Sequence, residues 1–169
     1  MNNLSIIIPT YNEAENIVPL IKEIEIYIAE VENFEIIVVD DNSPDNTYEK
    51  IQTFIHEKNR ANIHVIKRTW NKGLSSAIIE GSALAKFNYI AVMDGDGQHD
   101  PQDLNTMFKT LIASKKDLII GSSFYSTKMV SSLSTKRNLL SRIGNFFIRL
   151  VIKKELSDPL SGFFVAKAS

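Results

Sequence analysis

Cysteine is absent from the sequence, which excludes disulfides and zinc sites built from thiolates. Long apolar runs are absent too, and none approaches the roughly 18 residues that a membrane-spanning helix needs. The opening residues, MNNLSIIIPTYNE, lack the basic start and long apolar stretch of a secretory signal peptide. With 169 residues, 44% hydrophobic and 23% charged, the chain is predicted to be a soluble globular domain with a sizeable core.

Acidic side chains are missing from one part of the chain. Residues 121–154 contain seven basic side chains and no Asp or Glu, although the net charge of the whole chain is only −1. The remainder of the chain is therefore acidic. This asymmetry indicates an anionic partner near the basic segment.

Short apolar runs alternate with helical patterns along the first 122 residues. Strands are expected at 4–8, 34–40, 63–67, 89–94 and 117–122, and helices at 13–32, 44–58, 73–86 and about 101–114. Ser43 followed by Pro44 predicts the start of the second helix. The alternation predicts a mostly parallel sheet with helices on both faces.

Polar, turn-forming sequences follow four consecutive strands of this predicted sheet. They are PTYNE (9–13), DDNSPDNT (40–47), RTWNKGLSSA (68–77) and DGDGQHD (94–100). Ligands of parallel sheets bind at the carboxyl ends of the strands. Four such loops together indicate a common binding crevice.

The fourth of these loops has the strongest chemical signal. In an extended segment Asp94, Asp96 and Gln98 face one side, and Gly95 and Gly97 leave room beside them. Two carboxylates and an amide oxygen form a site suited to Mg²⁺ or Mn²⁺. The alternative is that both Asp residues shape turns and cap helices. Their place after an apolar strand, beside three other polar loops, favours the metal site.

The second loop offers two acids. One of Asp40 and Asp41 could accept a hydrogen bond from a nucleobase while the other holds the loop; the alternative is a turn and helix cap. Ser43, Pro44 and Asp45 are assigned to that capping role.

Single residues elsewhere have two readings each. Glu13 is equally consistent with a binding role and with an ordinary acid in the first turn of a helix. His99 is favoured as a hydrogen-bonded structural group over a metal ligand or base. Trp70 could stack on a base, and packing in the core or at its rim is as well supported. Gly73 could let backbone N–H groups approach a phosphate, although a glycine before a helix does not by itself indicate a phosphate site.

Five segments together resemble the family-2 glycosyltransferases with the GT-A fold. They are SIIIPTYNEAENI, IIVVDDNSPDNT, NKGLSSA, VMDGDGQHDP and DPLSGFF (158–164). The five segments occur in the same order over nearly the whole chain. Within the family, they resemble most specifically the dolichyl-phosphate mannosyltransferase group of polyprenyl-phosphate glycosyltransferases. It implies an α/β, Rossmann-like three-layer sandwich and one catalytic domain over residues 1–169, which could be truncated at its C-terminus.

The resemblance also implies roles for matched positions. The nucleotide-binding positions are Pro9, Tyr11, Glu13, Asp40, Asp41 and Asp94, and the metal-binding positions are Asp94, Asp96 and Gln98. Arg137 and Ser141 match positions near the donor and acceptor phosphates, and Arg142 is a further basic candidate beside them. Asp96 and Arg137 are the predicted catalytic residues. Residues 158–164 are expected to close the site near the sugar and the acceptor.

Two positions depart from the family pattern. Ser123 stands where relatives often carry Arg, so Lys128 or Arg137 would have to supply the missing phosphate-binding charge. Gly97 stands where a larger apolar residue is common, which leaves the donor sugar open.

The implied reaction transfers a sugar to a polyprenyl phosphate, with mannose from GDP-mannose as the expected donor and inversion at the anomeric carbon. A phosphate monoester is largely dianionic near neutral pH, so it needs no general base. The alternatives are a UDP-sugar donor, a saccharide hydroxyl acceptor, or a module that binds nucleotide sugars without catalysis. The expected partners are the nucleotide sugar, the lipid phosphate and the membrane surface, and no nucleic acid.

The segment at about 134–154 is predicted to be a basic amphipathic helix. Its apolar residues recur at helical spacing, whereas Arg142, Arg149 and Lys153 lie on another face. Such a helix could lie on an anionic membrane, which would make the protein peripheral at the cytoplasmic face. An ordinary helix with a solvated basic face explains the pattern equally well.

Overall fold

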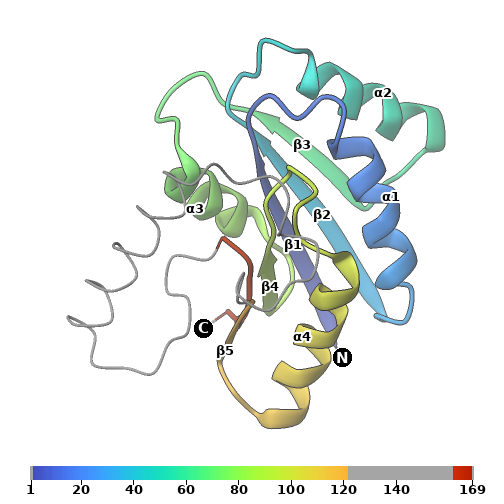
Figure 1. The fold of residues 1–169 in the computed structure, drawn as a ribbon, viewed down its shortest axis with the longest axis vertical. Coiled ribbons are helices and arrows are strands. Elements are labelled where there is room, and N and C mark those ends of the chain that lie inside the picture. Colours follow the sequence, from blue (N-terminus) through green and yellow to red (C-terminus); the bar gives the residue numbers. More distant parts are fainter. Residues whose placement is uncertain (1, 122–161, 169) are drawn as a thin grey trace.

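The computed structural model describes residues 2–121 and 162–168, which form a six-stranded sheet with helices on both faces (Figure 1). Its strands are β1 (Asn3–Thr10), β2 (Asn33–Asp40), β3 (Ile63–Lys67), β4 (Tyr89–Val92), β5 (Leu118–Ile120) and β6 (Phe164–Lys167). Their order across the sheet is β3-β2-β1-β4-β6-β5. The pairs among β1 to β4 are parallel, and β6 runs antiparallel to both β4 and β5. The predicted α/β fold with a mostly parallel sheet is confirmed.

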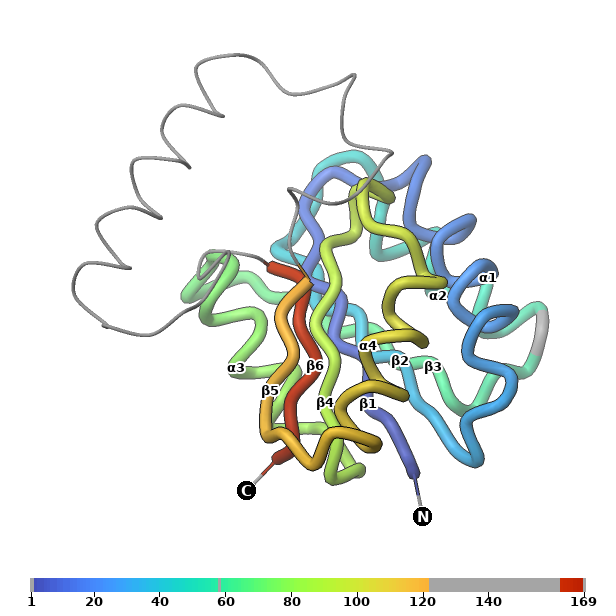
Figure 2. The backbone as a smooth tube through the Cα atoms, turned by 60° about the horizontal axis from the view of Figure 1, so that its bottom comes forward, coloured from blue at the N-terminus to red at the C-terminus, as the bar shows by residue number. Residues whose placement is uncertain are grey.

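The described helices form the two outer layers. They are α1 (Ile17–Tyr27), α2 (Thr47–Lys58), α3 (Leu74–Leu84) and α4 (Pro101–Ser114). Figure 2 shows α3 on one side of the sheet and α1 and α4 on the other. None of the helices within these described ranges is long and apolar enough to cross a bilayer.

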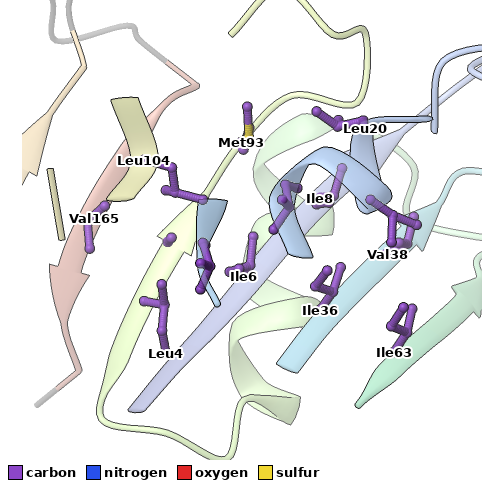
Figure 3. Close-up of a cluster of buried hydrophobic side chains, with 14 of the residues drawn as sticks. Leu4, Ile6, Ile8, Leu20, Ile36, Val38, Ile63, Met93, Leu104 and Val165 are labelled. Atoms are coloured by element: carbon purple, nitrogen blue, oxygen red, sulfur yellow. The ribbon is translucent and has the colours of Figure 1, made fainter. Parts of the chain in front are cut away.

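The strands supply two separate cores because successive side chains point to opposite faces of a sheet. Ile6 and Ile8 of β1 lie in the larger cluster, together with side chains of α1, α2 and α4 (Figure 3). Ile7, between them, packs with Ala77 of α3 in the smaller cluster. Each fully buried Ile contributes roughly 1.5–3 kcal/mol of transfer free energy. This apolar centre holds the strands in place while their ends carry polar loops.

Gly81 sets the distance between α3 and the sheet. A Cβ atom at this position would lie 2.5 Å from Cγ2 of Ile7 and 3.1 Å from Cγ2 of Val39. Only glycine therefore allows the helix to approach this closely. The close approach packs α3 against β1 and β2.

Three features of the fold differ from the sequence prediction. The helix predicted at 13–32 is shorter, since α1 spans Ile17–Tyr27. The strand β6 was not predicted, because four residues of mixed character give too weak a periodic signal. The predicted helix start at Pro44 is wrong, since α2 begins at Thr47. Asn46 has a left-handed backbone with φ of 65°, and the side chains of Ser43 and Asp45 bind a neighbouring loop instead of starting the helix there.

Candidate active site

The polar loops predicted to meet do lie at one edge of the sheet. β5 and β4 both run antiparallel to β6, so β1 to β5 all point the same way and their carboxyl ends share one edge. β6 runs in the opposite direction, so the two residues that precede it, Gly162 and Phe163, arrive at this same edge. Figure 2 shows the loops after β1, β2 and β4 gathered at one end of the molecule. This carboxyl edge is the candidate site.

The loop after β1 is fastened to the loop after β2 by three consecutive backbone groups. The N–H groups of residues 12–14 donate in turn to Ser43 Oγ, Thr47 Oγ1 and Asp45 Oδ2, at 2.9, 3.0 and 3.0 Å. The polar side chains of the second loop thus satisfy backbone donors of the first. Ser43 and Asp45 have a structural role, as expected. Both cap the β1 loop, and Asp45 also accepts from the N–H of Thr47, the first residue of its own helix.

Asp45 joins these loops in its ionised form. Burial acts to raise the pKa of Asp45, but hydrogen bonds from the Thr47 hydroxyl and from the N–H groups of Ala14 and Thr47 together lower that pKa below its ordinary value. The Thr47 hydroxyl donates at 2.5 Å and the Thr47 N–H at 3.1 Å. The carboxylate therefore stays charged at neutral pH and fixes the geometry of both loops.

Asp40 organises its own loop. It is fully buried and accepts hydrogen bonds from the Ser43 N–H, at 3.0 Å, and from the Ser43 hydroxyl. Both carboxylate oxygens serve this turn. Asp40 thus holds the turn of its own loop.

Asp41 is paired with Arg68, a residue that the sequence reasoning did not select. The Arg68 Nε donates to Asp41 Oδ1 at 2.7 Å, and Nη2 contacts the same oxygen. The Gly73 N–H donates to Asp41 Oδ2 at 2.7 Å. The sequence signal was a basic residue directly after an apolar strand, in a chain where the preceding strand ends in acidic residues. An unpaired charge that becomes buried at such a position would be costly.

Asparagine recurs in these loops because several turns need a left-handed backbone. The left-handed positions after β1, β2 and β3 are Asn12, Asn42, Asn46 and Asn71, with φ between 49° and 65°. Asparagine tolerates this conformation better than other residues with side chains. The Asn-rich composition of the strand ends is therefore required by loop geometry.

The loop after β4 meets the residues that precede β6. The Asp94 side chain is 35% exposed, and its Oδ2 lies 3.7 Å from His99 Nε2. The His99 ring stacks on Phe163 with 4.6 Å between centroids. A Cβ atom on Gly162 would lie 2.7 Å from Asp94 Oδ1, so the backbone at 162 rests against the carboxylate. The described end of the 158–164 segment thus lies at the acidic loop.

The remaining acids of this loop divide between local and open roles. Asp96 Oδ1 accepts from the Gln98 N–H at 2.9 Å, which is a turn contact that leaves its other oxygen for a ligand. Asp100 caps α4 by accepting from the Gln102 N–H at 2.9 Å. No group of three or more His, Asp or Glu side chains arranged around a common point occurs within residues 2–121 and 162–168.

The chemistry of this donor set fits a hard divalent cation. Asp94 and Asp96 are half-buried and both carry negative charge, which a divalent cation held by them would balance. Gln98 would add a neutral oxygen, and so short a ligand set leaves coordination positions for substrate oxygens. Gly95 brings the loop against β1, because a Cβ there would lie 2.7 Å from Thr10 Cγ2. Gly97, at φ of 72°, faces open space.

Two aromatic side chains stand exposed at this edge. Tyr11 is 56% exposed and Trp70 is 73% exposed, so packing of Trp70 in the core is excluded. Glu13 accepts from the Asn16 side chain at 2.8 Å, close to the start of α1. Pro9 is buried within β1, next to the last residue of the strand.

Part of the predicted site lies outside the described residues. This holds for the phosphate and acceptor candidates Arg137, Ser141 and Arg142, and for the family departure at Ser123 with its compensating Lys128. The basic segment at about 134–154 lies there as well.

Comparison with known proteins identifies the family of the chain. The family model described as Glycosyl transferase family 2 matches residues 5–169. A dolichol-phosphate mannosyltransferase of Pyrococcus furiosus is 38% identical over 166 residues, covering 97% of this chain and 46% of that protein. A dolichol-phosphate mannosyltransferase of Saccharomyces cerevisiae is 32% identical over 164 residues, covering 95% and 59%. The chain spans about half the length of the curated relatives it matches.

Solved structures share the fold at low identity. A mannosyltransferase from Pyrobaculum calidifontis in complex with GDP-Man and Mn²⁺ superposes with a TM-score of 0.60 at 22% identity, over 70% of this chain and 35% of that one. A glucosyl-3-phosphoglycerate synthase from Mycobacterium tuberculosis, in complex with Mn²⁺, UDP-glucose and phosphoglyceric acid, gives 0.70 at 16%, over 98% and 56%. The predicted GT-A fold is confirmed by these neighbours. Because the family model matches residues 5–169, nearly the whole chain, the chain belongs to glycosyl transferase family 2.

Proposed function

We propose that this chain is the nucleotide-sugar-binding, catalytic part of an inverting, metal-dependent glycosyltransferase. The reaction transfers mannose from GDP-mannose to dolichyl phosphate or a related polyprenyl phosphate. The observation that carries the proposal is the meeting of the Asp94–Asp96 loop with the loops after β1 and β2 at one edge of the sheet. The named activity of the relatives from Pyrococcus and Saccharomyces supports the choice of donor and acceptor.

The donor nucleotide is assigned to the loops after β1 and β2. Tyr11 and Glu13 stand partly exposed there. Asp41, which is buried and held by Arg68 and the Gly73 N–H, is the carboxylate assigned to a base N–H. Asp94, Asp96 and Gln98 would hold Mg²⁺ or Mn²⁺. When bound, such an ion neutralises the diphosphate and so makes the nucleotide a better leaving group. Neighbours of this fold that bind Mn²⁺ together with a nucleotide sugar support this assignment.

The acceptor chemistry explains why no general base is proposed. A polyprenyl phosphate is already an anionic nucleophile near neutral pH. The protein must hold two anionic substrates close together, and Arg137, Ser141 and Arg142 are the proposed groups for this. A single in-line displacement at the anomeric carbon inverts its configuration, with no covalent enzyme intermediate.

The proposal extends to the cellular setting and the domain. Residues 1–169 act as one catalytic domain, and the basic segment at about 134–154 brings it to the cytoplasmic face of a membrane. Its basic charge supports this contact, because anionic lipids attract Lys and Arg within a Debye length.

A UDP-sugar donor is the second candidate. The solved glucosyl-3-phosphoglycerate synthase, whose fold matches over 98% of this chain, binds UDP-glucose. A third possibility, a module that binds nucleotide sugars without catalysis, is disfavoured by the two carboxylates of the β4 loop.

A donor panel tests the proposal. The purified chain is incubated with a short polyprenyl phosphate, Mn²⁺ or Mg²⁺, and GDP-mannose, UDP-glucose or UDP-N-acetylglucosamine, and products are identified by mass. We expect a hexosyl-phosphate lipid with GDP-mannose only, and none after chelation of the metal. Product from a UDP-sugar alone would establish the second candidate, and nucleotide binding without product from any donor would favour the non-catalytic module.

A further inference from the structure

Arg68 ties three elements of the carboxyl edge together. Its side chain is 2% exposed and follows β3 directly. Besides its contacts with Asp41 after β2, its Nη1 donates to Ser76 Oγ in α3 at 3.1 Å and its Nη2 to the Gly73 carbonyl at 3.1 Å. A second carboxylate, Glu80 of α3, lies 3.5 Å from Nη1. One guanidinium thus sets the loop after β2, the loop after β3 and the start of α3 relative to one another.

The Arg68–Asp41 pair forms hydrogen bonds with both backbone polar groups of Gly73. Asp41 accepts the Gly73 N–H at 2.7 Å, and Arg68 donates to the Gly73 carbonyl. Gly73 has φ of 131°, a conformation open to glycine alone in practice. The pair therefore stabilises a loop shape that the chain would not adopt by local preference.

Stability alone does not explain a charged group in this place. A buried ion pair is often no more stabilising than well-packed apolar residues, because both charges lose their hydration. The pair Arg60–Glu25, whose side chains are 23% and 21% exposed, illustrates an ion pair away from the carboxyl edge. Arg68 differs because its partner is one of the residues assigned to the donor nucleoside.

We propose that Arg68 is a positioning residue for nucleotide binding, which acts through Asp41 and does not touch the nucleotide itself. The proposal rests on the function proposed above. Its planar fork fixes the Asp41 carboxylate, so the carboxylate meets the base of a nucleoside diphosphate without reorganising. Because the base does not change during transfer, this contact contributes equally to the ground state and the transition state. Loss of Arg68 should therefore raise KM and leave kcat nearly unchanged.

The test compares Arg68→Lys and Arg68→Gln with Arg60→Gln as a matched control. GDP and UDP are titrated into the purified full chain of each variant, and the thermal transition of each is measured by circular dichroism. We expect both Arg68 variants to weaken binding of the preferred nucleotide about tenfold or more, with Lys less affected than Gln because it keeps the charge. Arg60→Gln should bind like the wild type. Arg68→Lys retains the buried charge and serves if Arg68→Gln does not fold.

Two further readouts separate positioning from general structure. If Arg68 acts through Asp41, the double variant Arg68→Lys with Asp41→Asn should bind no more weakly than Asp41→Asn alone. A folded Arg68→Lys variant that binds the nucleotide as tightly as the wild type would overturn the proposal. A lower kcat with unchanged KM would also overturn it, because that pattern indicates a smaller fraction of active molecules and no change in nucleotide binding. A wild type that binds neither GDP nor UDP would overturn the proposed function itself, so the two failures are distinguishable.

Discussion

The two halves of the carboxyl edge are held in different ways. The half proposed to bind the nucleoside, called the nucleoside side, comprises residues 11–16, 41–47 and 68–76 and is joined by many hydrogen bonds of side chains with backbone and with one another. The half proposed to bind the metal, called the metal side, comprises residues 94–100 and 162–164. It is joined mainly by packing, through the stack of His99 on Phe163 and the contact of Gly162 with Asp94. The nucleoside side is a polar network. The metal side has two carboxylates with few partners, next to the packing contacts of residues 162 and 163, which are called the 162–163 contact.

This difference matches what each half is proposed to bind. A base is recognised by fixed hydrogen-bonding groups, and a network that is already satisfied holds such groups without a cost on binding. A divalent cation needs carboxylate oxygens that other cations have not neutralised. A bound cation would then balance the negative charges of Asp94 and Asp96.

The largest expected effect breaks the metal side. Asp96→Ala should reduce transfer on the order of 100-fold or more, because a bound divalent ion contributes several kcal/mol to charge stabilisation. Its thermal transition should change little, since the one side-chain contact of Asp96 within residues 2–121 and 162–168 is the turn contact with Gln98. The measurement is the initial rate at saturating Mn²⁺.

Asp103→Ala is the control for this variant. Asp103 is an exposed acid in the first turn of α4, outside the metal side. It should transfer at the wild-type rate. Normal transfer by Asp96→Ala would remove Asp96 from the metal site.

An intermediate effect on Mn²⁺ affinity is expected from a change in the 162–163 contact. Gly162→Ala places a methyl group 2.7 Å from Asp94 Oδ1, so the carboxylate or the segment must move. We expect an apparent Mn²⁺ affinity about tenfold weaker, as for other changes that reorient a metal ligand. Mn²⁺ dependence of the initial rate measures it, and an unchanged dependence would show that residue 162 does not constrain Asp94.

The sequence predicted the sheet and the place of the site because both depend on strong local signals. Apolar runs mark β1 to β4, and polar residues mark where each ends. The contacts between loops could not be predicted in this way. Arg68 pairs with a residue 27 positions away, and Gly162 reaches Asp94 only because β6 inserts antiparallel beside β4. Such pairings depend on the sheet order and leave no periodic pattern.

The smallest expected effect loosens the nucleoside side. Asp45→Asn should lower the free energy of unfolding by about 1 kcal/mol, since it weakens the charge-assisted hydrogen bonds to Ala14 and Thr47. Because the pKa of Asp45 is lowered in the folded protein, its stabilisation is present above the pKa of the unfolded chain and is lost as pH falls through the folded pKa. The free energy of unfolding, measured with urea, should therefore fall more steeply below about pH 4 in the wild type than in Asp45→Asn, which has no carboxylate to protonate at this position. Equal pH profiles for the two proteins would contradict this role.

The most direct test of the two-sided site is a calorimetric titration of guanosine and GDP into the wild type and Asp96→Ala, with and without Mn²⁺. Guanosine meets only the nucleoside side, so its affinity should be the same in both proteins and independent of Mn²⁺. GDP should bind the wild type about tenfold or more tightly with Mn²⁺, and Asp96→Ala should lose this gain. GDP affinity that is indifferent to Mn²⁺ in the wild type would contradict the assignment of the β4 loop as the metal side.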